Sequence, residues 1–551
     1  MARPSRRDLI RSAFATACAG LGLPGWAAPS GSSQSANARH APAIDVHIEL
    51  HAVMDQVAIR RGAPTRVWRY RGKLLRGDAG TLDESLGSYL GPVIRVRRGQ
   101  RVRIDLINGL PESTIVHWHG LHVPETMDGH PRFAIAPGER FVYDFTVDNR
   151  AGSYWFHPHP HGRTGKQVYF GLAGLFLVSD DEEAALGLPG HAQDLPLVIQ
   201  DRTLDDDNQL VYLSQSVAGA RSGDSQSRET SGGGMMGGGM MGGRSRGGMR
   251  QRMAGMMGVL GDEILVNGRP GARLTVEGRP HRLRLLNASN TRTYKLAWSD
   301  RSALTVIATD GGLLAAPLPR DYVMLAPAER IDLWVDFGRW SSATELTLQS
   351  LAFAAGTGMG GMMMGSSALP DGSAFPVLTL RIEGGAGSNA APPRRLSGLP
   401  RLDPSVAVNA DRPKVFALTM AMMAWGVNGR SFEMQGVSPL ETARLGTAEI
   451  WEFRNDAGAA MMGMTMPHSM HVHGLQFRVI GRSVESRFRA DHDTVQAGLV
   501  DEGWKDTVLV MPGERVRILL RFEDHPGLFL YHCHMLEHED TGLMRNYRIE
   551  A

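Results

Sequence analysis

The stretch APGERFVYDF at residues 136–145 returns twice along the chain, as APAERIDLWV at 326–335 and MPGERVRILL at 511–520. The copies lie roughly 190 residues apart, which is close to the length of one domain. A second echo precedes each copy, namely a Gly and an Asn at the same spacing, in Gly99–Asn108, Gly278–Asn287 and Gly446–Asn455. Two echoes at matched positions in three units indicate an internal repeat.

The segments inside the repeat alternate between apolar and polar residues, as in RVRIDL at 101–106 and RLRL at 282–285. Alternation bounded by Gly, Pro and Asn is typical of short β-strands. We therefore expect an all-β fold of three consecutive β-sandwich domains. The predicted limits are residues 39–183, 184–385 and 386–551, with a Met- and Gly-rich insert at 216–258 in the second domain.

The first 38 residues are predicted to be an export signal that is not part of the fold. Arg6 and Arg7 form a twin-arginine pair, and an apolar, small-residue stretch follows from Ala13 to Leu23. This order is typical of signals that export folded proteins. We expect a periplasmic protein, with an extracellular location as the alternative. We expect no transmembrane anchor, because so short an apolar stretch does not span a bilayer.

The 551 residues contain 2 Cys, 20 His and 28 Met, and their formal net charge is +2. So small a charge gives no reason to expect a nucleic-acid partner. Two cysteines without a CxxC motif cannot build a disulfide framework, and one of them, Cys18, lies in the predicted signal. A mature chain with one thiol, Cys533, and many imidazole and thioether groups is typical of a metal protein.

Ten histidines and Cys533 gather in four short clusters. The histidines are His117 and His119; His157 and His159; His468, His471 and His473; and His532, His534 and His538. Residues two apart on a strand face the same side of a sheet, so each His-x-His pair presents two imidazoles to one side. The sulfur of Cys533 must then face the side opposite to its flanking histidines. One strand is therefore predicted to serve two metal sites.

Two histidines and a cysteine form the blue-copper electron-transfer arrangement, which Cys533, His538 and His468 can supply. The other eight histidines are too many for one metal, and imidazole suits copper. A cluster of three coppers would use all eight, and four coppers match the four electrons that reduce O2 to water. A separate zinc site is the generic alternative for His plus Cys, and surface histidine tracts bind metal loosely. Four His-x-His pairs around one Cys argue against both alternatives.

At these motifs the chain resembles the three-domain multicopper oxidases of the bacterial laccase-like and copper-efflux type. The resemblance rests on HWHG at 117–120, FHPHPHG at 156–162, WKDT at 504–507 and HCHMLEHEDTG at 532–542, and it extends over nearly the whole mature chain. It implies three cupredoxin-like Greek-key domains, of which the second carries no copper ligand. It also implies an oxidase that couples one-electron oxidation of a donor to the reduction of O2.

The resemblance further implies how four copper ions share the ligands. The type 1 copper takes His468, Cys533 and His538; the type 2 copper takes His117 and His471; the type 3 pair takes His119, His157 and His534 on one ion and His159, His473 and His532 on the other. Asp128 and Glu539 match two acids that deliver protons to reduced oxygen in such enzymes. On its spacing alone, Asp128 could equally be a hydrogen-bonding or surface acid.

One position departs from the copper-efflux pattern, which places an axial Met five residues after the last ligand histidine. Here Leu543 holds that position and Met544 follows it. If the segment is a strand, the two side chains face opposite ways. We therefore expect a three-coordinate type 1 copper with Leu543 packed over it, uncoordinated. The missing weak thioether ligand should raise the potential.

Methionine is the main indication of the electron donor. Thioethers are soft ligands that suit Cu(I), and Met464 and Met466, just before His468, are candidate ligands for a substrate copper. The insert adds eight methionines between residues 235 and 257. Methionine also fills irregular gaps in cores and pads Gly-rich loops. The copper-efflux relatives use an Asp near here, where this chain has Met464.

Three hypotheses for the function follow. The first is O2-dependent oxidation of Cu(I) in copper tolerance, with phenols as further donors. The second is a laccase for organic phenols or amines without a role in copper homeostasis. The third, from another class, is a copper-binding or storage protein without turnover, against which the complete ligand set argues. For the oxidases we expect a monomer whose partners are O2 and Cu(I) or small phenols.

Overall fold

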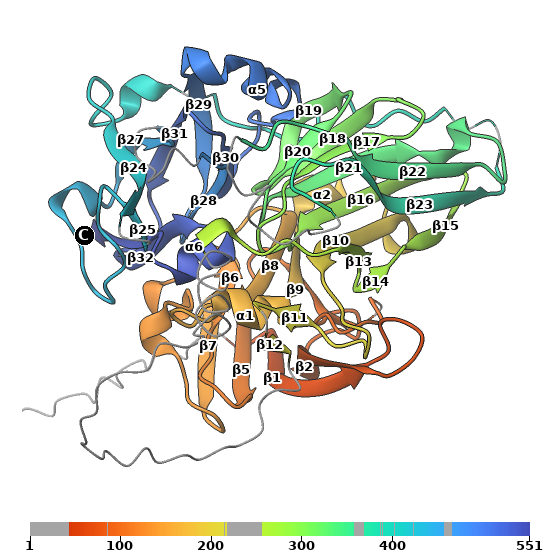
Figure 1. The fold of residues 1–551 in the computed structure, drawn as a ribbon, viewed down its shortest axis with the longest axis horizontal. Helices are drawn as coiled ribbons and strands as arrows, with labels where there is room; N and C mark the ends of the chain where they lie inside the picture. The colour runs from red at the N-terminus through yellow and green to blue at the C-terminus, as the bar shows by residue number, and fades with distance from the viewer. Residues whose placement is uncertain are drawn as a thin grey trace, which may run out of the picture. The chain divides into compact units, whose positions relative to one another are not determined.

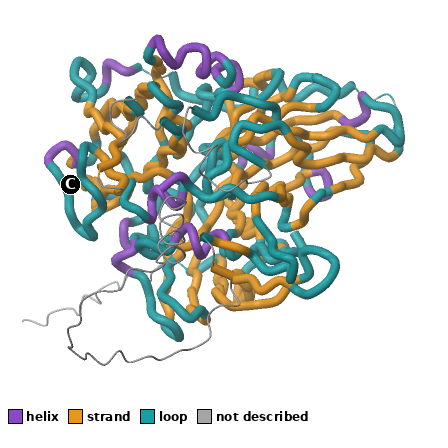
Figure 2. The backbone as a smooth tube through the Cα atoms, in the orientation of Figure 1, coloured by secondary structure: helices purple, strands orange, loops and turns teal. Residues whose placement is uncertain are grey.

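The computed structural model describes residues 43–84, 86–213, 215–216, 256–356, 369–385, 387, 389–401, 403–421, 424–456 and 465–551. The predicted signal, nearly all of the Met- and Gly-rich insert and Met464 lie outside these residues. β-Strands dominate the described chain and its helices are short, so the predicted all-β class is confirmed (Figure 1 and Figure 2). None of the described helices is long and apolar enough to cross a membrane.

The first β-sandwich combines a four-stranded sheet, in the order β2-β1-β5-β7, with a five-stranded sheet, in the order β3-β4-β9-β8-β6. One apolar core joins the two sheets and includes Trp118 and Tyr143, whose ring centroids are 5.2 Å apart. The strands are β1 (Val46–Val57), β2 (Thr65–Arg76), β3 (Leu82–Asp83), β4 (Val93–Arg97), β5 (Arg101–Gly109), β6 (Val116–His119), β7 (Arg140–Thr146), β8 (Gly152–Pro158) and β9 (Gly174–Ser179).

The second sandwich combines a seven-stranded sheet, in the order β14-β13-β10-β16-β21-β18-β19, with a five-stranded sheet, in the order β15-β23-β22-β17-β20. A small two-stranded sheet, β11-β12, is separate from them. The strands are β10 (Asp194–Arg202), β11 (Val211–Tyr212), β12 (Gln215–Ser216), β13 (Glu263–Val266), β14 (Arg269–Pro270), β15 (Arg273–Glu277), β16 (Pro280–Asn287), β17 (Tyr294–Trp298), β18 (Leu304–Thr309), β19 (Gly312–Arg320), β20 (Val323–Leu325), β21 (Arg330–Asp336), β22 (Glu345–Ser350) and β23 (Phe375–Glu383).

The third sandwich combines two five-stranded sheets, in the orders β25-β24-β27-β31-β29 and β26-β33-β32-β28-β30. Its strands are β24 (Lys414–Ala421), β25 (Ala424–Val427), β26 (Thr442–Arg444), β27 (Thr447–Arg454), β28 (His468–Val472), β29 (Phe477–Val484), β30 (Thr507–Val510), β31 (Glu514–Phe522), β32 (Gly527–Cys533) and β33 (Met544–Glu550). The α-helices of the described chain are α1 (Thr164–Tyr169), α2 (Asp181–Ala184), α5 (Arg489–Asp493) and α6 (Leu536–Asp540).

The three sandwiches share one pattern of strand pairing. In the first sheet of each, β1 runs parallel to β5, β10 to β16 and β24 to β27. In the second sheet of each, β4 runs parallel to β9, β15 to β23 and β26 to β33. The predicted series of three consecutive sandwiches is therefore confirmed, while the residue limits assigned to each domain stay predictions.

The repeated asparagine explains part of the sequence echo. In the second sandwich the Nδ2 of Asn287 donates hydrogen bonds to the carbonyls of Arg292 at 2.8 Å and Leu325 at 2.9 Å. Corresponding bonds run from Asn108 to Ile135 at 3.0 Å and from Asn455 to Val510 at 3.3 Å. Because buried carbonyls need donors, the same side chain recurs wherever the same turn is built.

The turn itself explains the rest of the echo. The third of its four residues has a left-handed backbone, with φ of +83° at Gly138, +72° at Ala328 and +70° at Gly513. Glycine adopts this conformation without a steric penalty, which accounts for its use in two of the three copies. The following glutamate accepts a hydrogen bond from the backbone N–H three residues before it, as Glu329 does from Ala326 at 2.7 Å.

Candidate metal centres

Four strands, the residues just after three of them and one short helix carry the ten histidines and Cys533. His117 and His119 lie on β6, His157 on β8 with His159 just after it, His468 and His471 on β28 with His473 just after it, His532 and Cys533 on β32 with His534 just after it, and His538 on α6. Strand pairing places His117 opposite His157 and His471 opposite His532. The two histidines of each His-x-His pair were predicted to face one side of a sheet, and strand pairing brings such histidines together in two sheets.

Eight of these histidines converge in one buried cluster, where none is more than 1% exposed. The Nε2 atoms of His117 and His471 are 3.3 Å apart; His157 Nε2 lies 3.4 Å from His119 Nδ1 and 3.3 Å from His534 Nε2; His532 Nε2 lies 3.3 Å from His159 Nε2 and 2.9 Å from His473 Nε2. These three groups contain the residues expected for the type 2 copper and the two type 3 coppers. Nitrogens of different groups also approach within 4.8 Å, so the division among single ions stays a prediction.

Hydrogen bonds on the far side of several rings set which nitrogen faces the cluster. The Nδ1 atoms of His117, His471, His157 and His532 lie within 2.7–3.1 Å of the backbone carbonyls of Asp128, Asp506, Pro158 and Cys533 respectively. In these four histidines Nε2 therefore points inward. Such outer contacts fix the tautomer and the ring orientation of metal-binding histidines.

Burial favours the neutral form of six of the eight imidazoles, because a charged ring is poorly solvated in the interior. It lowers the pKa values of His119, His157, His159, His471, His473 and His534 well below the ordinary value, and neighbouring histidines lower them further. Neutral imidazole is the form that binds metal, and it suits copper. The donor set therefore fits copper.

Cys533 lies on the other side of β32, with two further histidines. Its Sγ is 3.6 Å from Nδ1 of His468 and 3.8 Å from Nδ1 of His538, and all three residues are buried. The indole of Trp425 covers both imidazoles, at centroid distances of 4.8 Å and 4.7 Å. Burial raises the pKa of the Cys533 thiol to about 12, whereas a bound cation would favour the thiolate. This trigonal set fits the blue-copper arrangement.

Both predicted acids touch the eight-histidine cluster. The Oδ2 of Asp128 accepts a hydrogen bond from His473 Nδ1 at 2.8 Å, and its Oδ1 lies 3.5 Å from His117 Nδ1. Asp128 is 1% exposed, so it is not a surface acid, and burial raises the pKa of its carboxyl. Glu539 has Oε2 3.2 Å from Nδ1 of His532 and Oε1 3.7 Å from Nε2 of His159. Each carboxyl can therefore exchange protons with the cluster's surroundings.

Leu543 lies just before the last strand, β33, which begins at Met544. Leu543 belongs to the buried apolar cluster that contains Cys533, and its carbonyl accepts a hydrogen bond from the Cys533 N–H at 2.9 Å. Met544 lies opposite His532 in the strand register, so its side chain shares the face of His532. An uncoordinated Leu543 at the axial position of Cys533 remains our prediction.

The methionines near the Cys533 centre are only partly described. Met466 is half-buried against the core of the third sandwich, and its carbonyl accepts a hydrogen bond from Asn455 at 2.8 Å. Met256, at the end of the insert, is 5% exposed, and its carbonyl accepts a hydrogen bond from Trp425 Nε1 at 3.0 Å. The end of the insert is thus bonded to the indole that covers His468 and His538.

Two residues at the cluster escaped prediction from the sequence. Asp506 lies 3.0 Å from His119, and Arg330, from the second sandwich, binds Asp506. Asp506 stood in the WKDT motif and Arg330 stood in the repeated stretch. Both residues therefore lie in stretches that the sequence singles out, but the repeat in which Arg330 lies indicates a structural role and not a contact with the histidines.

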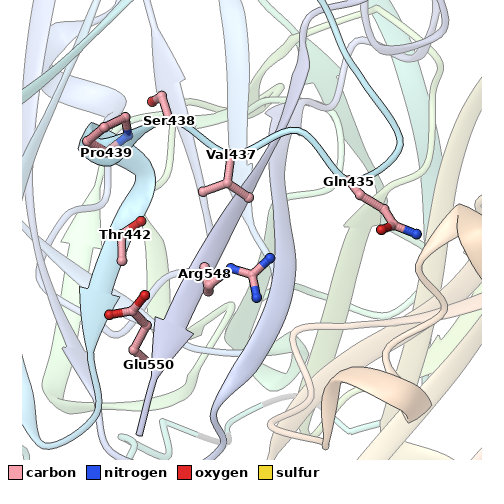
Figure 3. Close-up of a pocket in the computed structure, with 7 residues that line it drawn as sticks. All are labelled: Gln435, Val437, Ser438, Pro439, Thr442, Arg548 and Glu550. Carbon is pink, nitrogen blue, oxygen red and sulfur yellow. The ribbon is translucent and has the colours of Figure 1, made fainter.

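A hollow of about 690 Å³ is lined by none of these residues, so it gives no indication of a donor site beside the centres (Figure 3). It is lined by Gln435, Val437, Ser438, Pro439, Thr442, Arg548 and Glu550.

The chain combines three consecutive β-sandwiches with a buried His₂Cys centre next to a cluster of eight histidines. Together these features define a multicopper oxidase. Comparisons agree, because family profiles described as "Multicopper oxidase" match residues 84–183 and 407–551. A laccase of Bacillus stratosphericus is 31% identical over 526 residues, covering 88% of this chain and 90% of the relative. The multicopper oxidase Mco of Staphylococcus haemolyticus is 29% identical, covering 84% and 83%.

The fold agrees as well. The crystal structure of the 2F4 variant of the multicopper oxidase McoA from Aquifex aeolicus matches with a TM-score of 0.71 and 32% identity, over 92% of this chain and 96% of that one. The chain belongs to the multicopper oxidase family. It is therefore an oxidoreductase of the class that uses O2, and its histidine clusters are consistent with the copper sites of that class.

Proposed function

We propose that this protein couples the one-electron oxidation of Cu(I), and of small phenols, to the reduction of O2 to water. The single observation that carries the proposal is strand β32, on which Cys533 stands between His532 and His534. One strand thereby joins the His₂Cys centre to the eight-histidine cluster through adjacent residues. Bound copper would supply the redox chemistry, and the chain would hold, orient and enclose it.

The proposed ligands follow the groups that lie together. His468, Cys533 and His538 would hold the type 1 copper, with Leu543 packed over it and uncoordinated. His117 and His471 would hold the type 2 copper. The type 3 pair would use His119, His157 and His534 on one ion and His159, His473 and His532 on the other.

Asp128 and Glu539 are the proposed proton donors. Each buried carboxyl contacts histidines of the cluster from outside, Asp128 next to His473 and His117, and Glu539 next to His532 and His159. The next residue, Gly129, has φ of +82°, and a Cβ added there would overlap the carbonyl of Val116, so the glycine lets the chain after Asp128 pass close to β6. A carboxyl so placed can release protons as water forms.

Methionine content supports Cu(I) as donor. Met466 and the described end of the insert at Met256 lie near the Cys533 centre, and thioethers favour Cu(I). Met464 and Met466 stay candidate substrate-copper ligands. The laccase relative favours the second candidate, a laccase for phenols or amines. A storage protein without turnover is the third.

The remaining proposals concern the setting of the enzyme. Export by the twin-arginine route would place it in the periplasm, or outside the cell, where copper tolerance would be its role. The domain limits at 39–183, 184–385 and 386–551, and a monomeric state, belong to the same proposal.

Steady-state O2 uptake by the copper-loaded protein, with Cu(I) and with a phenol, separates these functions. Cu(I) oxidase activity predicts a higher kcat/KM for Cu(I). Deletion of residues 235–255, which keeps Met256 and its hydrogen bond to Trp425, should lower that value while leaving the phenol value unchanged. Equal Cu(I) values with and without the deletion would contradict the role of the insert. Absence of O2 uptake with either donor would favour storage.

A further inference from the structure

The second sandwich contributes none of the predicted copper ligands, yet one of its arginines reaches the histidine cluster. Arg330 begins β21, and its side chain is 0% exposed. Its two terminal nitrogens donate to Asp506, from Nη1 to Oδ1 at 2.7 Å and from Nη2 to Oδ2 at 2.5 Å. This bidentate geometry is the strongest that an arginine makes with a carboxylate.

The remaining donors of Arg330 are also used. Nε donates to the carbonyl of Ser153 at 2.9 Å, Nη1 to that of Ala328 at 3.0 Å, and Nη2 to that of Asp310 at 3.1 Å. An arginine has five N–H donors, so the guanidinium is fully bonded. Its position is therefore fixed by both its own sandwich and the first one.

Asp506 in turn contacts two histidines of the cluster by different groups. Its Oδ1 lies 3.0 Å from Nε2 of His119, and its backbone carbonyl accepts a hydrogen bond from Nδ1 of His471 at 2.8 Å. The two imidazoles are stacked, with centroids 3.7 Å apart and an interplanar angle of 14°. Because Asp506 occupies Nε2 of His119, Nδ1 of that ring is the nitrogen that faces the cluster.

Gly120, the residue after His119, leaves room for the ion pair of Arg330 and Asp506. Gly120 has φ of +87°, and a Cβ added there would lie 2.5 Å from Oδ2 of Asp506 and 2.9 Å from Nη2 of Arg330. Any side chain at this position would push the ion pair away from β6. Gly120, the glycine of the HWHG motif, therefore leaves room beside β6 for the ion pair between Arg330 of the second sandwich and Asp506 of the third.

The same turn of the second sandwich reaches the third at two more points. The hydroxyl of Ser469, between His468 and His471, donates to the carbonyl of Pro327 at 2.7 Å. Lys505, next to Asp506, lies 3.0 Å from Glu329. The turn at 326–330 therefore contacts β28, which carries His468 and His471, and the residues just before β30.

We infer that Arg330 is a positioning residue, which acts through Asp506 to orient His119 and His471 for copper. The inference rests on the proposed copper sites. It predicts that loss of the guanidinium weakens the eight-histidine cluster and leaves the Cys533 centre intact, since no bond of Arg330 involves a ligand of that centre.

The test compares Arg330→Met and Arg330→Lys with a matched control, Arg292→Met. Arg292 is also 0% exposed and lies in the second sandwich, where it binds Asp201 at 2.8 Å and the carbonyls of Gly261 and Leu369. The measurements are copper per chain, the type 2 electron paramagnetic resonance signal and the type 1 visible band.

Arg330→Met should bind type 2 copper 10–100-fold more weakly, with altered type 2 hyperfine coupling and a full type 1 band. Arg330→Lys should restore part of the affinity, and Arg292→Met should keep the wild-type signals. The inference is overturned if Arg330→Met keeps the wild-type affinity and hyperfine coupling, or if it loses the type 1 band together with the type 2 copper.

If Arg330→Met does not fold, Asp506→Asn is measured by the same criteria, because it keeps the size of the side chain and removes its charge. Failure of the proposed function is distinguishable, since it would appear in the wild-type protein as fewer than four coppers per chain.

Discussion

Replacing Asn287 by Ala tests the idea that the repeated asparagine is a structural requirement of each sandwich. The side chain is 0% exposed, donates to two carbonyls at 2.8 and 2.9 Å, and accepts from the N–H of Ser289 at 3.0 Å. Alanine leaves three buried backbone groups without these partners. Each backbone group left without a hydrogen bond costs about 1–3 kcal/mol, and the surrounding chain can relax to recover part of that cost. The free energy of unfolding should therefore fall by about 3 kcal/mol.

Calorimetry of the copper-loaded protein measures this loss. For a domain of roughly 150–250 residues, 1 kcal/mol shifts the melting temperature by about 2–4 °C, so the transition of the second sandwich should fall by about 6–12 °C. Asn108→Ala and Asn455→Ala should act similarly on the other two sandwiches. The exposed Asn389→Ala is the control, with an expected change within about 0.5 kcal/mol. A shift of Asn287→Ala no larger than that of the control would refute the reasoning.

Three further outcomes are expected. Leu543→Met, a swap of similar volume, should lower the type 1 potential in a redox titration of the visible band because it offers a thioether; an unchanged potential would mean that Leu543 does not lie over the copper. Glu539→Gln should lower kcat for O2 uptake by about 10²–10⁴-fold with the type 1 band retained, and full activity would remove Glu539 from proton delivery. Burial lowers the pKa of His130 to about 4, against about 6.5 when unfolded, so the unfolded chain binds the extra proton and stability should fall by about 3 kcal/mol as pH falls from 6.5 to 4. Denaturant unfolding of copper-loaded His130→Gln should show a smaller loss over that range, and an equal loss would assign the effect to other groups.

Much of the fold could be predicted because the repeat records local requirements. The left-handed turn at Gly138 and the asparagine that bonds beside it are properties of a few neighbouring residues, so they leave a trace in the sequence. The alternation of apolar and polar residues in the strands likewise allowed the all-β class to be predicted. The order of strands in each sheet could not be derived in this way, because pairing partners such as β4 and β9 are distant in sequence.

The candidate site was predicted to the extent that its residues share short motifs. The His-x-His spacing anticipates that His532 and His534 face away from Cys533, and the structure places them in the eight-histidine cluster. The contact of Arg330 with Asp506 spans 176 positions and depends on how two sandwiches pack, which no local pattern expresses. Asp128 shows the same limit, since only the fold reveals that it is buried against His473.

The most direct test of the function is a joint measurement of copper content and O2 stoichiometry in the purified, copper-loaded protein. The proposed four-copper oxidase predicts four coppers per chain, a blue type 1 band that Cys533→Ser removes, and four donor electrons consumed for each O2, with water as product. One or two coppers per chain, or release of hydrogen peroxide at two electrons per O2, would contradict it.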